Sequence, residues 1–278
     1  MKKKIIALAL AAILVVLTLG LASCTGKDEP GAAGESGTGD AEKKTLTVGF
    51  DATFPPMGFT DDKGNLVGFD LDLAKEVATR LNMKLELKPI VWDTKDAELK
   101  TGGIDMIWNG FTITGRENDY TWSEPYMRNN QVIVVKENST IKSLDDLKGK
   151  KLALQSGSSA DTALDGKPDF KNSLGKVIKT EQNLEALNEV GTGMVDAALM
   201  DETVAAYNIA KQGGKFKIIG DPLAAEEYGV GFLKGNTELR DAVNAELLKM
   251  AEDGTMLEIA QKYVDQGLVL DSLCLINK

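Results

Sequence analysis

The sequence predicts an α/β fold with mainly parallel sheets. From Thr45 onward, strand-like apolar runs alternate with segments whose apolar residues recur at helical spacing, and this alternation is typical of parallel strands joined by helices. This part of the chain is about 230 residues long, which is enough for two lobes that each bury a core. After the apolar run at residues 5–19 no second long one occurs, so we expect the body of the protein to be soluble.

The first half of this body contains the clearest periodic patterns. Residues 46–50 read as a strand, and Phe54-Pro55-Pro56 behind it restricts the backbone to an extended, rigid turn. Residues 71–81 carry apolar side chains at helical spacing, with Asp70 or Asp72 available as the N-cap. The other expected elements are a strand at 85–87, a short helix at 93–99 closed by Gly102 and Gly103, and buried strands at 104–108 and 131–136.

The second half continues the alternation without an internal repeat. Ser143 can cap a short helix that runs through Leu147. The further expected elements are a strand at 151–155, a helix that follows residues 156–159, a strand at 195–200, a helix at 202–212, a strand at 229–233 and two helices within 239–266 that Gly254 separates.

The N-terminus has the order of an export signal. Met1-Lys2-Lys3-Lys4 places positive charge ahead of the apolar run, and Leu21-Ala22-Ser23-Cys24 follows it, as in signal peptides. The alternative is a membrane-spanning helix, but the run ends in small residues without a basic flank.

Leu21-Ala22-Ser23-Cys24 resembles the bacterial lipobox. The resemblance implies that residues 1–23 are a lipoprotein signal peptide, and that Cys24 becomes the lipid-modified N-terminus on the extracytoplasmic face of the membrane. Residues 24–44 are rich in small and charged residues, so we expect a flexible tether rather than a domain. An ordinary secretory signal with a cysteine at its cleavage site is the alternative.

Composition excludes several classes of function. Loss of Lys2, Lys3 and Lys4 with the signal leaves 29 basic residues against 42 acidic ones, a net charge of −13, and such a chain is a poor nucleic-acid binder. The chain has no histidine, so a Ser-His nucleophile or a His-ligated zinc is excluded. With Cys24 held in lipid, Cys274 is the one other cysteine, and no disulfide framework is expected.

The segment Gly68-Phe69-Asp70-Leu71-Asp72-Leu73-Ala74-Lys75-Glu76-Val77-Ala78 fits a family signature. It resembles the polar amino-acid binders of ABC importers, the family 3 extracellular solute-binding proteins related to glutamine, histidine and lysine/arginine/ornithine binders. The resemblance covers residues 45 to 266 and implies two α/β lobes. Their expected bounds are 45–127 and 227–270 for lobe 1 and 128–226 for lobe 2, with hinge crossings near 126–130 and 224–228 and a C-terminal tail at 271–278.

In such binders the ligand lies between the lobes, at the C-terminal ends of the strands, where open α/β sheets generally bind ligands. The resemblance implies that Arg116, in Gly110-Phe111-Thr112-Ile113-Thr114-Gly115-Arg116, binds the ligand carboxylate, which a planar guanidinium fits. Thr112 would donate its backbone N–H to the carboxylate, and its hydroxyl oxygen would accept from the ammonium. Ser158 and Ser159 open a helix across the cleft, where free N–H groups favour an anion.

The α-ammonium needs an acidic partner. The resemblance assigns that role to Asp201, whose competing role is the N-cap of the helix that follows, with the Gly110 carbonyl as a second acceptor. Phe54 and Trp92 match the aromatic residues that enclose the ligand; a position in the core is their alternative.

Four further residues should decide which side chain is accepted: Asp51, Asn109, Gln155 and Met200. Gln155 stands where the glutamine binder has a lysine, so it would leave Asp51 less neutralised. A carboxylate without a cation partner disfavours acidic ligands. We therefore expect neutral polar ligands such as glutamine or cystine, or basic amino acids, ahead of acidic ones.

The resulting expectation is the substrate-binding component of an ABC importer for an L-amino acid, which closes its lobes on the ligand. It would be a monomer without cofactor, metal or catalysis, and its partners would be a permease and an ATPase. The alternatives are a cyclohexadienyl dehydratase-like enzyme, and a sensor or adhesin on the same fold.

Overall fold

The structure is a computed structural model that describes residues 44–276. The predicted signal peptide, Cys24 and all of the predicted tether except Lys44 lie outside the described residues, as do Asn277 and Lys278. Within residues 44–276, no helix combines the length and the apolar character that crossing a membrane requires.

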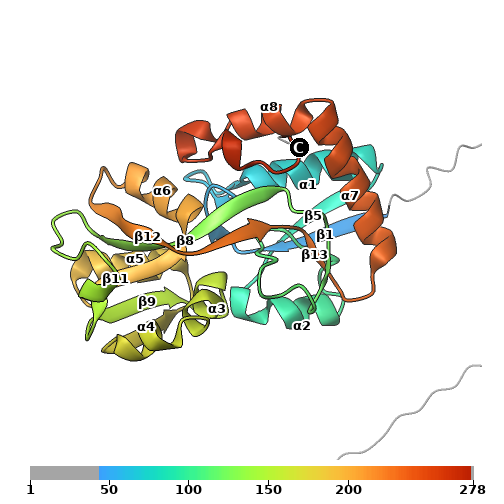
Figure 1. The fold of residues 1–278 in the computed structure, drawn as a ribbon. Helices are drawn as coiled ribbons and strands as arrows, with labels where there is room; N and C mark the ends of the chain where they lie inside the picture. The colour runs from blue at the N-terminus through green and yellow to red at the C-terminus, as the bar shows by residue number, and fades with distance from the viewer. Residues whose placement is uncertain (1–43, 277–278) are drawn as a thin grey trace, which may run out of the picture. The chain divides into compact units, whose positions relative to one another are not determined.

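The first sheet has five strands in the order β5-β1-β6-β13-β7 (Figure 1). β1 runs parallel to β5 and β6, whereas β13 is antiparallel to β6 and β7. Apolar side chains of β1 and the long helix α1 share one core cluster, and α1 packs against α7 and α8. The bounds are β1 (Thr45–Phe50), β5 (Lys84–Pro89), β6 (Met106–Ile107), β7 (Thr121–Trp122), β13 (Gly231–Phe232), α1 (Phe69–Arg80), α7 (Thr237–Glu252) and α8 (Thr255–Gln261).

The opposite face of this sheet has a separate aromatic core. Met106 belongs to the cluster under α1, but its neighbour Ile107 packs with Trp92 and Phe111, because successive side chains of a strand point to opposite faces. The 3-10 helix η1 (Trp92–Thr94) and the helix α2 (Lys95–Lys100) lie on this side. A small sheet of β2 (Thr53–Phe54), β3 (Gly58–Thr60) and β4 (Leu66–Val67) completes this part of the fold, and the Pro55–Pro56 peptide bond is cis.

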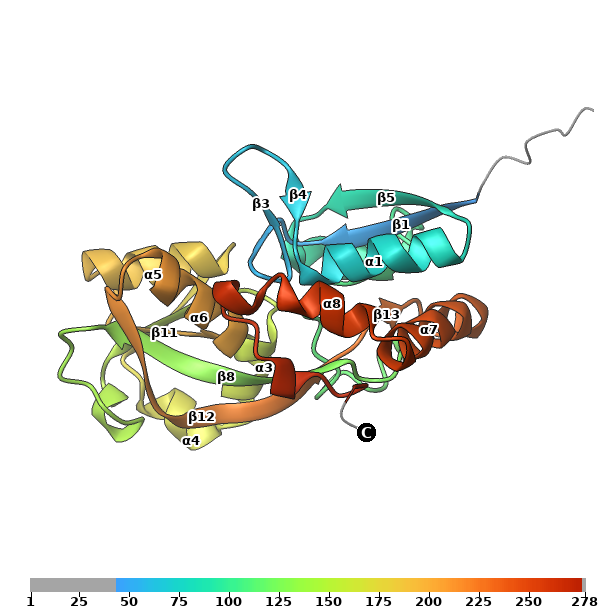
Figure 2. The ribbon, with the colours of Figure 1, turned by 90° about the horizontal axis from the view of Figure 1, so that it is seen from above.

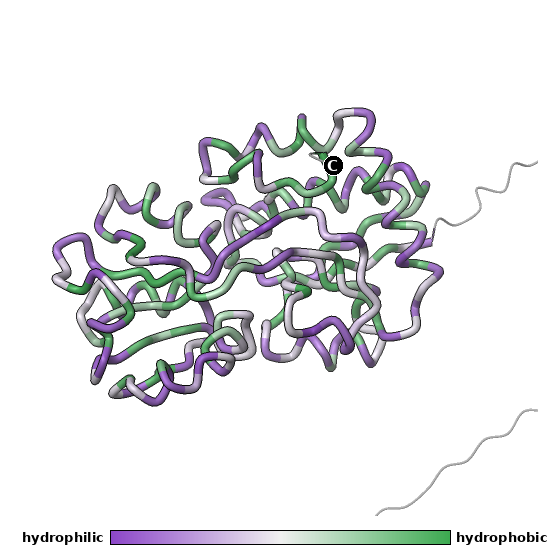
Figure 3. Tube along the Cα trace, in the orientation of Figure 1, coloured by the Kyte–Doolittle hydropathy of each residue, from purple (hydrophilic) through white to green (hydrophobic). Residues whose placement is uncertain are grey.

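The second sheet also has five strands, in the order β10-β9-β11-β8-β12. Along β8, Val132 and Val134 face one core cluster while Ile133 and Val135 face the other. Helices therefore cover both faces, and Figure 3 shows hydrophobic residues along these strands. The bounds are β8 (Met127–Lys136), β9 (Lys151–Gln155), β10 (Lys176–Thr180), β11 (Ala197–Asp201), β12 (Phe216–Tyr228), α3 (Ser159–Asp165), α4 (Pro168–Ser173), α5 (Asn183–Thr192) and α6 (Glu202–Lys211).

The two long strands β8 and β12 connect the two sheets. Figure 2 shows them side by side as they leave the second sheet toward the first. They pair antiparallel with Met127 opposite Tyr228 and Asn129 opposite Glu226, beyond a register shift between Ile219 and Ala224. We call the paired residues 127–131 and 224–228 the hinge ribbon. In β8 the polar run Arg128 to Gln131 precedes the apolar residues of the sheet, so the crossing carries polar side chains.

Most predicted elements are present, but both predicted side-chain caps are wrong. The helix α1 begins at Phe69 with Gly68 as its N-cap residue and no side-chain cap, because the Asp70 carboxylate turns into the protein and accepts a hydrogen bond from Gly110 N–H at 2.6 Å. Ser143 does not cap a helix either: the segment is the 3-10 helix η2 (Asp145–Leu147) with Leu144 at its N-cap. The structure adds β2, β3, β4, β7, β10, α4 and α5, none of which was predicted from the sequence, and β12, of which only the hinge crossing near 224–228 was predicted.

Candidate ligand-binding site

One narrow cavity lies where the two sheets meet. It is lined by nine of the twelve residues predicted from the sequence: Phe54, Trp92, Gly110, Thr112, Arg116, Gln155, Ser158, Ser159 and Asp201. The first five belong to the part of the chain around the first sheet, and the other four follow or end strands of the second sheet. Its free volume is about 10 Å³, about the room of one water molecule, so an amino acid can enter only if the two sheets move apart.

Arg116 brings a buried cation to this cavity. Its guanidinium donates through Nη1 to the Thr112 carbonyl at 3.4 Å and through Nη2 to the Gly157 carbonyl at 3.2 Å. Gly157 follows β9, so the second bond joins the two halves of the protein. Burial lowers the pKa of Arg116, and the surrounding groups Tyr120, Glu226 and Asp201 oppose that shift. An arginine stays protonated under such conditions, which makes it a fixed positive charge in the cleft.

Asp201 supplies the opposite charge from the last position of β11. Its Oδ1 accepts hydrogen bonds from the Tyr228 hydroxyl at 2.7 Å and from Asn129 Nδ2 at 3.0 Å. Burial raises its pKa well above the usual range, and the nearby negative charge of Glu226 adds to the effect. Asp201 occupies the N-cap position of α6 but makes no capping bond through its side chain, so its carboxylate serves the hinge and the cavity.

The serines and the threonine hold polar groups at the cavity wall. Ser158 is the N-cap of α3, where its Oγ accepts from Asp161 N–H at 3.4 Å and donates to the Gln155 carbonyl at 2.7 Å. Ser159 Oγ accepts from Gln131 Nε2 at 3.0 Å. Thr112 is 1% exposed and its Oγ1 has no hydrogen-bond partner within residues 44–276. A buried hydroxyl of this kind calls for an explanation, and a ligand group would satisfy it.

Gln155 connects the two halves of the protein through Asp51. Its Nε2 donates to Asp51 Oδ2 at 2.8 Å, while its Oε1 accepts from Asn183 Nδ2 at 2.9 Å. Asp51 Oδ1 accepts from the backbone N–H and the hydroxyl of Thr53. The side chain opposite Asp51 is therefore a neutral amide, and Asp51 itself is not among the residues that line the cavity.

Two predicted selectivity residues do not line the cavity either. Asn109 is 1% exposed, and its Oδ1 accepts from Asp51 N–H at 3.0 Å. Its Nδ2 lies only 2.7 Å from where a Cβ on Gly58 would stand, so the amide faces the protein interior. Met200 is fully buried in a core cluster. In this arrangement both residues support the site from behind.

Three residues around the cavity were not predicted from the sequence. Lys95 is 6% exposed, and its Nζ donates to the Gly157 carbonyl at 3.4 Å and lies 5.4 Å from the ring centre of Trp92. Burial lowers the pKa of Lys95. Asn129 and Glu226 lie in the hinge ribbon, behind Asp201. No local pattern distinguished these residues from ordinary surface positions.

Asp70 also proves to be part of the support of the site. Its Oδ2 accepts from Gly110 N–H at 2.6 Å and from the Tyr126 hydroxyl at 2.8 Å. Gly110 has a φ of 55°, and a Cβ there would approach Phe54 Cε1 to 2.8 Å. Complete burial raises the pKa of Asp70 to about 7. The family signature in α1 thus fixes the loop that carries the cavity wall.

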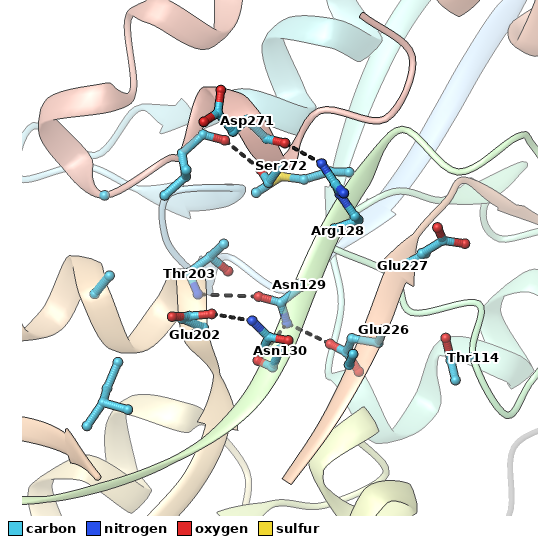
Figure 4. A pocket seen from close by; sticks show the side chains of 16 residues that line it. Thr114, Arg128, Asn129, Asn130, Glu202, Thr203, Glu226, Glu227, Asp271 and Ser272 are labelled. Atoms are coloured by element: carbon cyan, nitrogen blue, oxygen red, sulfur yellow. Dashed lines mark hydrogen bonds between the residues drawn. The ribbon is translucent and has the colours of Figure 1, made fainter. Parts of the chain in front are cut away.

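A larger cavity, of about 750 Å³, lies along the hinge ribbon (Figure 4). Its lining includes Asn129, Glu226 and Glu227, together with residues of α6 and of the C-terminal segment 267–272. None of the nine residues of the narrow cavity contributes to it. Asn129 and Glu226 therefore lie between the two cavities.

Comparison with known proteins identifies the family. Residues 46–266 match the bacterial extracellular solute-binding proteins, family 3. The chain is 34% identical over 226 residues to the L-cystine-binding protein TcyJ of Escherichia coli (strain K12), a match that covers 80% of this chain and 83% of TcyJ.

Solved structures agree with this assignment. A substrate-binding protein of an ABC uptake transporter from Streptococcus pneumoniae, with bound histidine, has a TM-score of 0.77 and 34% identity over 81% of this chain and 94% of its own. An ancestral arginine-binding protein bound to arginine has a TM-score of 0.74 and 42% identity over 80% of this chain and 99% of its own. The two-lobed α/β fold predicted from the sequence is confirmed. The chain belongs to the bacterial extracellular solute-binding proteins of family 3.

Proposed function

We propose that this protein is the lipid-anchored, substrate-binding component of an ABC importer for a polar or basic L-amino acid. It acts by closing its two lobes on the ligand, and a permease and an ATPase receive the closed form. No chemical step is needed for this role. The free ligand shifts the equilibrium toward the closed state because it contacts both lobes at once.

The observation that supports this function best is that opposite charges from the two halves of the protein reach one cavity. Arg116 comes from the segment behind β6, and Asp201 ends β11 of the second sheet. A zwitterionic amino acid carries a carboxylate for the guanidinium and an ammonium for the acid. The buried Thr112 hydroxyl adds a further polar group.

The preference for polar or basic side chains rests on Asp51. Its side-chain partners are the amide of Gln155 and the hydroxyl of Thr53, both of which are neutral. Asp51 lies behind Gln155, which lines the cavity, so a ligand with an acidic side chain would approach this carboxylate without a compensating cation. The family relatives named above bind cystine, histidine and arginine, and none of these side chains carries a net negative charge.

Membrane attachment is proposed through Cys24. Two acyl chains on one residue anchor a protein stably, whereas a single chain binds reversibly. The test compares the membrane fractions of the full chain and of Cys24→Ala in a bacterial host. We expect the wild type in the membrane and the variant in the soluble fraction; an unchanged membrane fraction would contradict the anchor.

The binding function is tested by a thermal-shift screen of the common amino acids and cystine. A ligand at 100 times its Kd stabilises the folded state by about 2.7 kcal/mol, which gives a clear rise in Tm. We expect the rise with a polar or basic amino acid. If no amino acid raises the Tm, the proposed function is wrong.

Calorimetry on Arg116 variants tests the site. Removing one partner of a buried charge pair costs about 2 kcal/mol or more, so Arg116→Ala should weaken binding by at least about 30-fold. Arg116→Lys keeps the charge but loses the planar guanidinium. Its affinity should lie between those of the wild type and Arg116→Ala. Arg240→Ala is the control, because Arg240 forms a surface ion pair with Asp241 in α7. Wild-type affinity in Arg116→Ala would contradict the assignment.

A further inference from the structure

Two buried carboxyl groups lie next to each other at the narrow cavity, with Asp201 in its wall and Glu226 behind it. Asp201 is 2% exposed and Glu226 is 6% exposed. A single amide joins them, because Asn129 Nδ2 donates to Asp201 Oδ1 at 3.0 Å and to Glu226 Oε1 at 2.6 Å. Gln131 Nε2 donates both to the same Glu226 oxygen, at 2.9 Å, and to Ser159 Oγ, at 3.0 Å. Glu226 is thus connected to two residues of the cavity wall.

The charges around this pair favour one negative charge rather than two. Arg116, from the opposite half, is the cation that acts on both acids. From the hinge ribbon, the Tyr228 hydroxyl donates to Asp201, and burial raises the pKa of Tyr228 well above its usual range. From α6, Glu202 is turned to Asn130 Nδ2 at 2.7 Å. Two adjacent buried carboxylates with one cation cannot both ionise readily.

We propose that Glu226 is a second acid of the ammonium subsite, that it shares one proton with Asp201 in the unliganded protein, and that this proton leaves when an amino acid binds. The inference rests on the proposed function. It assigns to Glu226 a positioning role through Asp201, because Glu226 does not line the narrow cavity itself.

The orientation of the ligand sets the direction of the proton movement. Its ammonium contacts Asp201, while its carboxylate binds Arg116 farther away. The ligand ammonium is nearer to Asp201 and Glu226 than the ligand carboxylate is. Its positive charge therefore dominates and stabilises the ionised form of the two acids. The ammonium replaces the proton as the positive charge beside Asp201, and the proton passes to buffer.

The larger cavity gives this proton an exit. Glu226 lines it on the other side of the hinge ribbon, and Figure 4 shows Glu226 hydrogen-bonded to Asn129 at its wall. The proton can therefore reach solvent through the hinge while the closed lobes seal the narrow cavity. A proton held by Asp201 alone would have to leave through the closing cleft.

Calorimetry in buffers of different ionisation enthalpy tests the proposal. L-Glutamine and L-arginine serve as probes, since their side chains do not titrate near neutral pH. At about pH 7 the observed binding enthalpy of the wild type should vary with the ionisation enthalpy of the buffer. The sign of that variation should be the one expected when binding releases protons to the buffer. By linkage, the affinity should rise with pH, by up to about 10-fold per pH unit for one proton.

Glu226→Gln is the decisive variant. Its amide oxygen can still accept from Asn129 and Gln131, but it removes the second acid. We expect measurable binding in which both the buffer dependence and the pH dependence of affinity are smaller than in the wild type, because burial alone then raises the pKa of Asp201. Glu227→Gln is the matched control, because Glu227 is the next residue of β12 and its side chain is exposed; it should behave as the wild type.

The outcomes separate this proposal from the proposed function. If no probe binds the wild type, the proposed function fails for these ligands. If a probe binds without proton release, or if Glu226→Gln releases as many protons as the wild type, the shared proton is wrong. Should Glu226→Gln not fold, the pH dependence of wild-type affinity decides alone: affinity that is constant between about pH 5 and 8 contradicts the proposal.

Discussion

At the scale of single residues, Asp70 links the helix α1 to the loop at Gly110. Its contribution to the stability of the fold depends on pH. Its pKa is raised to about 7 by burial, so the folded state holds its proton more tightly than the unfolded chain does. Stability from this group is fully present below the ordinary carboxyl pKa and is lost as pH rises toward about 7. Each pH unit in that window is worth at most about 1.4 kcal/mol.

Asp70→Asn should remove this slope. The amide oxygen can still accept from Gly110 N–H and from the Tyr126 hydroxyl, and it has no proton to lose. Urea unfolding at several pH values from about 4 to about 8 measures the difference. Asp72→Asn, two residues along the same helix and bonded to the Tyr263 hydroxyl, is the control that should retain the slope. Equal slopes in the wild type and Asp70→Asn would show that another group causes the dependence.

The same residue shows what the sequence could indicate about the site. The resemblance to the family identified site residues by motif, and nine of these residues line one cavity in the structure. It could not give the partner of a buried side chain, because Asp70 and Gly110 are 40 residues apart in the chain. Asp70 was therefore predicted as a helix cap, and Asn109 as a selectivity residue, although its amide faces Gly58.

At the scale of elements, the strongly periodic α1 was predictable, whereas several paired strands were not. The pattern of α1 is strong enough to define a helix by itself. β7 has two residues, Thr121 and Trp122, and exists because it pairs with β13. β10 was missed as well, and it is a strand paired to β9 at the edge of the second sheet. Such strands are set by tertiary pairing rather than by local propensity.

The C-terminal segment, which extends beyond the family match, packs against the hinge ribbon. Leu273 is fully buried and pairs with Met127, and Cys274 N–H donates to the Tyr126 carbonyl at 2.9 Å. Leu273→Ala should lower the free energy of unfolding by about 2–5 kcal/mol, the usual cost of such a truncation in a core.

The control lies in the same segment. Val269 is 60% exposed, so Val269→Ala should change stability by less than about 0.5 kcal/mol. Urea unfolding of the three proteins at one pH makes the comparison. Equal stabilities for Leu273→Ala and the wild type would mean that the segment does not contribute to the fold.

At the scale of the whole molecule, the contacts around Gly157 join the two halves of the protein and allow the proposed lobe closure to be tested. Gly157 belongs to the second half of the protein and accepts hydrogen bonds from Arg116 and Lys95 of the first. A Cβ at this position would lie 2.8 Å from Asp93 Oδ1 and 3.7 Å from Lys95 Nζ. A larger side chain at residue 157 would displace the side-chain ends of Asp93 and Lys95 in this arrangement, whereas separated lobes would accommodate it without that movement.

Gly157→Leu should hold the lobes apart. Overpacking costs about 1–3 kcal/mol, so amino-acid affinity should fall by about 5- to 150-fold. In small-angle scattering, the wild type should contract when the ligand binds, and the variant should not. Gly149→Leu is the matched control, because Gly149 has a similar φ, 71° against 64°, and nothing lies within 4 Å of its Cβ position. It has the same backbone strain without the contact between lobes, so it should lose stability but keep its affinity. Wild-type contraction and affinity in Gly157→Leu would show that binding does not require the closed arrangement.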